Sequence, residues 1–222
     1  MQPFEIIPHI VTAKQKKIRV YPQHVNRASS AGHPCKFYLY ACREHWHDKL
    51  LHDAFTQMMF EGGNVIEDKV IRDFQESGLT VVEQQKPFEM KYLELTGHLD
   101  CKILKDGIAY PIEIKGLNPY EWEKLNCIED FLMSKRSWIK SYPAQLSLYM
   151  LAENVEYGCF YIINKVNWRP KEIWISLDFT YTESILKNLE EVNKAIKTKT
   201  PPEKINQPDI CQYCGFLHIC LP

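Results

Sequence analysis

Asp100, Glu113 and Lys115 have the side-chain types and the spacing that metal-assisted hydrolysis requires. Glu113 and Lys115 lie two positions apart in residues 111–116, a segment with strand character, and strand side chains two apart project to the same face. A hairpin signal at Asp106-Gly107 would fold this segment back beside Asp100. The two carboxylates then supply hard oxygen ligands for Mg²⁺ or Mn²⁺.

Lys115 would orient or deprotonate an attacking water and offset charge at a phosphate, provided that a neighbouring cation or desolvation lowers its pKa. An ordinary amphipathic hairpin with Glu113 and Lys115 in water has the same pattern. Three further features favour a site: Glu67 on an upstream helix, Gln145 and Tyr149 four residues apart on a downstream helix, and a cysteine cluster.

The cysteine cluster is the run Cys211, Cys214 and Cys220, in which three thiolates fall within ten residues. Such spacing is typical of metal or cluster ligation, and four thiolates suit tetrahedral zinc as well as an iron–sulfur cluster. His218 could replace a cysteine at zinc. The cysteines in strand or helix patterns are expected to be plain core or surface thiols: Cys101, Cys127 and Cys159.

The elements that must position these residues alternate between helix and strand. Residues 1–34 are expected to be a solvated strand and loop, residues 35–60 helical segments, and residues 64–76 a helix set off by Gly62-Gly63 and stopped at Ser77-Gly78. A meander of antiparallel strands should follow over residues 79–82, 88–95, 98–104 and 108–114.

The second half repeats the alternation. Residues 118–140 and 143–154 have helical patterns, with Pro143 in a first turn, and residues 157–166 and 172–179 have strand patterns. Thr180 and Glu183 predict the capping box of a last helix, along which an apolar stripe is formed by Ile185, Leu189, Val192 and Ile196. We expect one α/β domain over residues 1–222 with a mixed sheet, a core at about 60–180 and cluster-binding parts at about 30–45 and 205–222.

The composition of the chain limits its class, its partners and its location. The chain has 222 residues, of which 45% are hydrophobic, and a formal charge of −1, so any contact with nucleic acid must come from local patches. No run of eighteen apolar residues and no signal peptide occur, which predicts a soluble, cytoplasmic protein with no membrane contact.

One local patch precedes the Gln145 helix, where cations and aromatic residues interleave. Cations can neutralise phosphates while an aromatic ring stacks on a base without reading its sequence, so the pattern indicates single-stranded DNA. A helix surface with a buried tryptophan is the alternative. The candidate DNA-binding residues are Lys135, Arg136, Trp138, Lys140 and Tyr142.

These motifs together resemble the RecB-like PD-(D/E)XK nucleases, most closely the CRISPR-associated Cas-four exonuclease family, and also the nuclease domain of AddB. The matching segments are Gly63 to Glu67, Gly97-His98-Leu99-Asp100, Glu113-Ile114-Lys115 and Gln145 to Tyr149. The resemblance implies a restriction-endonuclease-like fold with a mixed β-sheet flanked by helices. It also implies metal ligation by Asp100, Glu113 and Glu67, while Gln145 and Tyr149 hold the DNA phosphate or Lys115.

Two positions depart from the family pattern. Leu99 stands where the name-giving proline would be, and Ile66 stands where many relatives have a metal-binding histidine. A ligand must then come from Glu67 or from solvent. His98 is a weak substitute, since a structural histidine is the favoured interpretation.

The resemblance also implies a [4Fe–4S] cluster, with Zn²⁺ at the cysteines as the alternative. Cys35 matches the lone N-terminal cysteine of the family, with Cys42 in reserve, so the cluster would join the N-terminal region to the C-terminal tail. Closing so long a loop suits a structural role.

The resemblance implies a metal-dependent deoxyribonuclease, an exonuclease on single-stranded ends, in CRISPR adaptation, phage recombination or DNA repair, with integration or recombination proteins as partners. A catalytically silent DNA-binding or adaptor protein is a rival that intact Asp100, Glu113 and Lys115 disfavour. A zinc-stabilised scaffold unrelated to DNA is a third interpretation.

Overall fold

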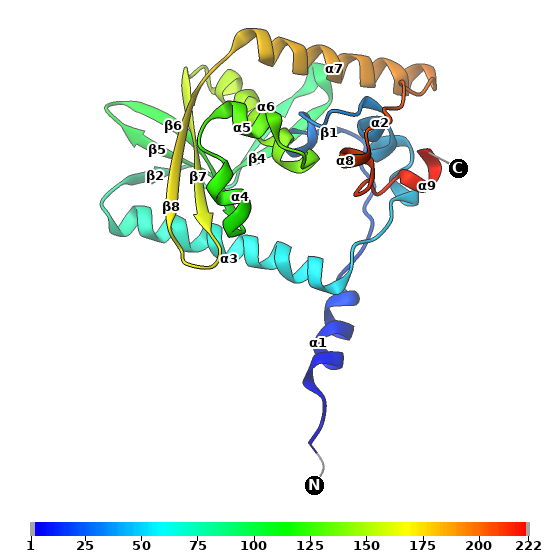
Figure 1. Cartoon of the computed structure of the whole chain (residues 1–222). Coiled ribbons are helices and arrows are strands. Elements are labelled where there is room, and N and C mark those ends of the chain that lie inside the picture. The colour runs from blue at the N-terminus through cyan, green and yellow to red at the C-terminus, as the bar shows by residue number, and fades with distance from the viewer. Residues whose placement is uncertain (1–2, 221–222) are drawn as a thin grey trace.

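The computed structural model describes residues 3–220, and its centre is a mixed five-stranded sheet (Figure 1). The strand order is β2-β5-β6-β7-β8, in which β6 and β7 run parallel and every other neighbouring pair is antiparallel. The strand bounds are Thr80–Val82 for β2, Cys101–Lys105 for β5, Ile108–Leu117 for β6, Tyr157–Asn164 for β7 and Pro170–Ser176 for β8.

A second, three-stranded sheet has the order β1-β4-β3, with β1 at Asn26–Arg27, β3 at Lys86–Met90 and β4 at Leu95–Leu99. The single strand expected over residues 98–104 is therefore wrong, because the chain leaves β4 at Leu99 and enters β5 of the other sheet at Cys101. Asp100 is the residue between the two sheets. The predicted meander is correct only for the β5–β6 hairpin, whose turn residues Asp106 and Gly107 both have positive φ.

Helix α3 (Ala54–Glu76) covers one face of the five-stranded sheet. It begins where the Asp53 side chain accepts a hydrogen bond of 2.7 Å from Thr56 N, and it ends before Gly78 at φ 85°. The predicted interruption at Gly62-Gly63 is wrong, because the helix runs through both glycines. The residues of α3 that pack on the sheet are Ile66, Val70, Ile71 and Phe74.

The opposite face is covered by α6 (Ser137–Glu153) with α4 (Pro119–Lys124) and α5 (Ile128–Met133). The prediction that a helix starts at Pro143 is wrong, since Pro143 lies inside α6. Residues 143–150 of α6 are all buried, and the tertiary packing of this central helix outweighs the backbone hydrogen bond that a proline cannot make.

Helix α7 (Phe179–Thr198) packs across the smaller sheet, on the far side of the molecule from α3 (Figure 1). Asp178 caps it by accepting a 3.0 Å hydrogen bond from Tyr181 N, so the capping box predicted at Thr180 is wrong. The expected apolar stripe contributes Ile185, Leu189 and Val192 to a core shared with β4 and α6.

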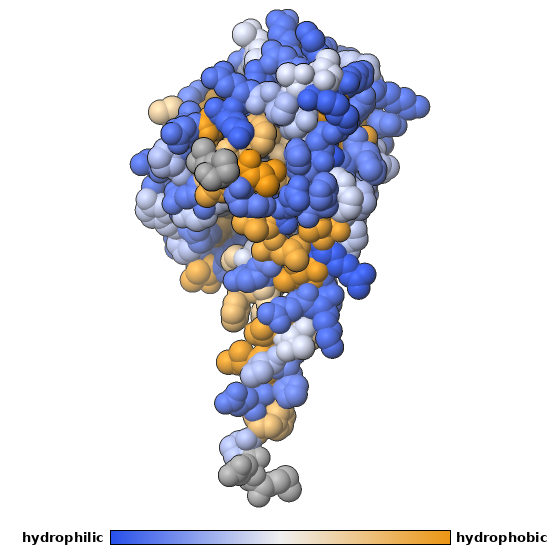
Figure 2. All heavy atoms as spheres, turned by 90° about the vertical axis from the view of Figure 1, so that its right-hand side faces the viewer, coloured by the Kyte–Doolittle hydropathy of each residue, from blue (hydrophilic) through white to orange (hydrophobic). Residues whose placement is uncertain are grey.

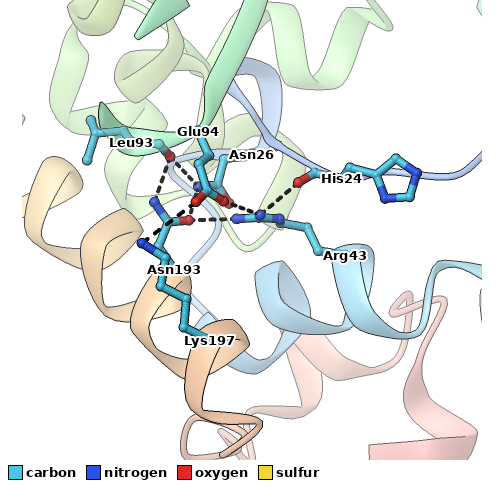
Figure 3. A network of polar contacts seen from close by, with 7 residues as sticks. All are labelled: His24, Asn26, Arg43, Leu93, Glu94, Asn193 and Lys197. Carbon is cyan, nitrogen blue, oxygen red and sulfur yellow. Dashed lines mark hydrogen bonds and ion pairs between the residues drawn. The ribbon is translucent and has the colours of Figure 1, made fainter. Parts of the chain in front are cut away.

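A buried polar network ties α2 (Lys36–Glu44) to α7 and to the start of β4 (Figure 3). Arg43 donates to Asn193 Oδ1 at 2.6 Å and to the His24 carbonyl at 2.7 Å, and it pairs with Glu94. Asn26 and Asn193 both donate to the Leu93 carbonyl, at 2.9 and 2.8 Å. The two terminal nitrogens of Arg43 are thereby paired inside the protein, while Nε has no hydrogen-bond partner among residues 3–220, and the bond to the His24 carbonyl positions the N-terminal segment.

The N-terminal segment forms α1 (Ile6–Gln15), a helix where a strand and loop were expected. Lys14 of α1 and Lys17, two residues beyond its end, pair with Glu61 of α3. Figure 2 shows α1 projecting from the body with hydrophobic side chains on it and around its base. The exposed hydrophobic residues of α1 and of residues 50–59 include Ile6, Ile7, Leu50, Leu51, Phe55 and Met59.

The C-terminal segment forms α8 (Pro208–Cys211) and α9 (Leu217–Cys220), which pack against α2. Three single-turn helices complete the described elements: η1 at Ala28–Ser30, η2 at Trp46–Asp48 and η3 at Lys91–Leu93. No helix within residues 3–220 is both long and apolar enough to cross a membrane.

Candidate active site

Glu113 is the most deeply buried charged residue at the candidate site, with none of its surface exposed. Its Oε1 atom pairs with Lys115 Nζ, whereas Oε2 has no hydrogen-bond partner among residues 3–220. Burial, with a further contribution from the Asp100 carboxylate, raises the pKa of Glu113 to about 8. One carboxylate oxygen is thus free for a ligand.

Asp100 lies beside Glu113 because of the switch between the two sheets. Its Oδ2 atom accepts a 2.8 Å hydrogen bond from Ile114 N, and its backbone carbonyl accepts a 3.0 Å hydrogen bond from Gln85 N. The side chain is nine-tenths buried, and burial raises its pKa. Asp100 is therefore fixed between β5, β6 and the loop before β3.

Glu67 reaches the same site from α3, and Gln85 connects it to Asp100. The Gln85 amide donates to Glu67 Oε1 and, at 3.5 Å, to Asp100 Oδ1. Burial and the Asp100 charge raise the pKa of Glu67. Gln85, at φ 47°, is a site residue that no sequence motif indicated, because it lies in a loop whose position depends on both sheets.

Lys115 is held as an ammonium ion in this arrangement. Burial opposes its charge, but the carboxylates of Glu113 and Asp100 outweigh burial and raise its pKa above the usual value. The condition for Lys115 to act as a base, a lowered pKa, is thus not met here. Its Nζ atom lies 4.9 Å from the centre of the Tyr142 ring, so Tyr142 lines the site.

Gln145 and Tyr149 face the site side of α6 but bond to β4 rather than to Lys115. Tyr149 donates a 2.6 Å hydrogen bond to the His98 carbonyl, and Gln145 Nε2 donates to the Tyr149 hydroxyl at 3.2 Å. A Cβ atom at Gly97 would lie 3.0 Å from that hydroxyl and 2.8 Å from Ala28 Cβ, so the close approach requires glycine. This pair holds the strand that leads into Asp100.

Ile66, at the position of the family histidine, and His98, its weak substitute, have different surroundings. Ile66 is buried in the core under α3, and a Cβ atom at Gly116 would overlap its Cδ1 atom. His98 exposes its side chain at the surface, and its backbone carbonyl carries the contact with Tyr149. Within residues 3–220, no three His, Cys, Asp or Glu side chains converge closely enough to hold a metal ion as they stand.

The cations of the candidate DNA-binding patch have protein partners. Lys135 lies 3.6 Å from Asp209, and Arg136 lies 3.5 Å from Glu121 and beneath the Tyr213 ring. Lys140 donates to the Leu132 carbonyl at the end of α5. Trp138 is 45% exposed and packs edge-on against Tyr142, with ring centres 5.8 Å apart.

The four candidate cluster cysteines gather where α2 meets the C-terminal segment. Cys35 and Cys220 are buried in one hydrophobic cluster with Phe216, and Cys214 packs against it. Burial raises the pKa of the Cys214 thiol, and the neighbouring sulfurs of Cys35, Cys211 and Cys220 add to the shift. The Phe216 amide donates to Cys214 Sγ at 3.4 Å. Cys42 is buried in the same cluster.

The other cysteines have ordinary surroundings. Cys101 and Cys159 lie in the core between α3 and the sheet. Cys127 is exposed at the start of α5, where its Sγ atom lies 3.4 Å from Asp130.

The arrangement of elements is similar to that of two solved structures. SSO0001 superposes with a TM-score of 0.56 at 16% identity, over 98% of this chain and 97% of that chain. The alkaline exonuclease LHK-Exo from Laribacter hongkongensis superposes with a TM-score of 0.54 at 13% identity, over 87% of this chain and 94% of that chain.

No family model and no curated protein sequence matches the chain. At such low identity the likeness shows the fold alone. The chain therefore shares the arrangement of a mixed α/β domain with a structurally characterised exonuclease, and the predicted mixed sheet flanked by helices is confirmed. Its own activity must be argued from the site.

Proposed function

We propose that this protein is a metal-dependent deoxyribonuclease that acts as an exonuclease on single-stranded ends. The observation that carries the proposal is the free, fully buried Oε2 atom of Glu113 beside Asp100 and Lys115. These residues occupy a fold shared with an alkaline exonuclease.

The carboxylates present are of the ligand type that a divalent cation requires, and binding one would draw Glu67, Asp100 and Glu113 closer together than they stand. An unpaired buried carboxylate oxygen is costly, and a cation shared with Asp100 would remove that cost. Asp100, Glu113 and Glu67 would hold Mg²⁺ or Mn²⁺, which prefer oxygen ligands. The bound ion would stabilise charge at the scissile phosphate and acidify a water molecule.

The side chains around the carboxylates would supply the remaining parts of the mechanism. The Lys115 ammonium group is placed to orient the attacking water and to offset negative charge on the phosphate, and the Tyr142 ring keeps it in place. Tyr149 and Gln145 hold the backbone before Asp100, and Gln85 holds Glu67 toward Asp100. These contacts would preorganise the carboxylates before DNA arrives.

Four cysteine thiolates are proposed to bind a [4Fe–4S] cluster, with zinc as the alternative. The supporting observation is the shared position of Cys35, Cys211, Cys214 and Cys220 between α2 and the tail. The cluster would hold the two ends of the chain together. CRISPR integration or recombination proteins are the proposed partners.

A catalytically silent DNA-binding or adaptor protein is the second candidate. Ile66 favours it, because isoleucine cannot bind a metal at the position where relatives have a histidine. Proteins of this kind would keep DNA binding and the cysteine site without turnover.

End-labelled single- and double-stranded DNA, with Mg²⁺, Mn²⁺ or a chelator, separates these candidates. The nuclease shortens single strands progressively from an end only with metal, and Asp100→Ala abolishes this while circular dichroism stays unchanged. A folded wild-type protein that binds DNA without cleaving it under any metal would favour the silent candidate. Zinc at the cysteines without DNA binding or cleavage would favour a scaffold.

A further inference from the structure

The turn between β7 and β8 holds a tryptophan in an unusual backbone conformation. Trp168 has φ 60°, in the left-handed region that bulky side chains rarely adopt, and its side chain is 48% exposed. Among residues 3–220 the indole forms no ring pair and its Nε1 atom no hydrogen bond. A strained backbone conformation at an exposed residue that has no role in packing points to a role in function.

The turn is built to keep that conformation. The buried Asn164 side chain accepts hydrogen bonds from Val166 N at 3.0 Å and Asn167 N at 3.5 Å, and Trp168 N donates to the Asn164 carbonyl at 2.9 Å. Asn167 in turn accepts a 3.1 Å hydrogen bond from Arg169 N. The indole is therefore presented on a rigid support at low entropic cost for binding.

The turn lies next to the candidate active site. Ile162 of β7 pairs with Lys115 of β6, and Lys165 N donates to the Leu117 carbonyl at 2.8 Å. At about 3.3 Å per strand residue, the turn begins on the order of 10 Å beyond Lys115. The Lys165 side chain folds back over Gly116, where its Cε atom would lie 2.9 Å from an added Cβ atom. Figure 1 shows this turn as the yellow loop that closes β7 and β8.

The cationic side chains of the turn are free to bind a phosphate group. Lys165 and Arg169 are exposed, and neither forms an ion pair within the part of the chain that the structure describes. The cations of the 135–142 patch, in contrast, have protein partners. Two free cations on either side of an exposed indole are the pattern that suits a single strand, with phosphates on the cations and a base on the ring.

We propose that residues 165–169 form a binding surface for single-stranded DNA beside the active site, with Trp168 stacking on an unpaired base. The proposal rests on the proposed nuclease function for the identity of the ligand. Lys165 and Arg169 contact the phosphates on either side of that base. A strand that enters the site crosses the turn within a few nucleotides of Lys115.

Fluorescence anisotropy with a labelled single-stranded oligonucleotide, in a chelator so that nothing is cleaved, tests the surface directly. Trp168→Gly removes the ring and suits the positive φ, so the melting temperature should stay the same or rise while the Kd increases about tenfold. Trp168→Phe keeps a stacking ring and should stay within about threefold of the wild type. Trp174→Ala is the matched control, because Trp174 is also half-exposed but lies on β8 outside the turn, and its Kd should not change.

Lys165→Ala and Arg169→Ala should each weaken binding and lower the slope of log Kd against log salt by about 0.7. Trp168→Gly binding within twofold of the wild type, or no measurable binding by the wild type, overturns the surface. An equal loss of affinity for a blunt duplex overturns the assignment of the surface to single-stranded DNA. If cleavage depends on Asp100 while Trp168→Gly leaves the Kd unchanged, the proposed binding surface is wrong and the proposed nuclease function stands. If Trp168→Gly raises the Kd but the wild type never cleaves DNA, the proposed nuclease function is wrong and the binding surface stands.

Discussion

The hydroxyl group of Tyr149 donates a 2.6 Å hydrogen bond to the backbone carbonyl of His98, two residues before Asp100. This bond joins α6 to β4 where the chain passes from one sheet to the other. The glycine at position 97 is what allows the ring to come so close. A buried residue of α6 thus fixes the backbone that positions the Asp100 side chain.

Tyr149→Phe should slow cleavage about tenfold and lower the free energy of unfolding by about 1 kcal/mol, because the ring still packs on Phe88 while one buried hydrogen bond is lost. Single-turnover cleavage and urea denaturation measure the two effects. Tyr181→Phe is the control, since the hydroxyl of the half-buried Tyr181 has no hydrogen-bond partner in residues 3–220, and it should leave the rate unchanged. An unchanged rate in Tyr149→Phe would show that the bond does not position Asp100.

Glu113→Gln should abolish cleavage without lowering the melting temperature of metal-free protein. The amide oxygen still accepts a hydrogen bond from Lys115, Asp100 still offsets the Lys115 charge, and the cost of an unpaired buried carboxylate oxygen is removed. The rise in melting temperature that Mn²⁺ gives the wild type should also disappear, because binding to the folded state alone stabilises it. Glu172→Gln, an exposed strand glutamate, should keep both properties. A Mn²⁺-induced rise that persists in Glu113→Gln would remove Glu113 from the metal site.

Gly116→Ala should destabilise the fold by about 1–3 kcal/mol, because its Cβ atom would overlap Ile66 Cδ1 under α3. Ile66→Val removes that methyl group and should recover at least half of the loss in the double variant. Gly62→Ala is the control, because nothing lies within 4 Å of its added Cβ atom and alanine favours a helix interior. Urea denaturation of both single variants, the double variant and the control gives the four values, and additive losses in the double variant would contradict the overlap.

Protein purified without oxygen should be brown and contain iron and sulfide. Alanine at Cys35, Cys211, Cys214 or Cys220 should remove the colour and lower thermal stability, because the cluster would join α2 to the tail. Alanine at Cys101, Cys127 or Cys159 should keep the colour.

Cys42→Ala is the decisive control, because Cys42 is buried in the same cluster of residues as Cys35. A colourless Cys42→Ala beside a brown Cys35→Ala would mean that Cys42 is the N-terminal ligand. One equivalent of zinc with no iron would refute the iron–sulfur cluster and leave the nuclease site untouched.

Local chemistry determined the parts of the fold that the sequence predicted correctly. The β5–β6 hairpin depends on a two-residue turn, and the common face of Glu113 and Lys115 depends on strand alternation. The apolar stripe of α7 likewise depends on helical spacing alone. Each of these is a property of residues a few positions apart.

Tertiary packing decided what the local pattern could not. Helix α6 continues through Pro143 because the burial of residues 143–150 outweighs weak local propensity. Helix α3 continues through Gly62-Gly63 into the segment from Ile66 onward that packs on the sheet. The sheet switch at Asp100, the Gln85 bridge to Glu67 and the site beneath Tyr142 each depend on segments far apart in the chain. The sequence alone determined which side chains could do chemistry, and only the packed sheets decided which of them meet, because contacts between distant segments leave no periodic pattern to read.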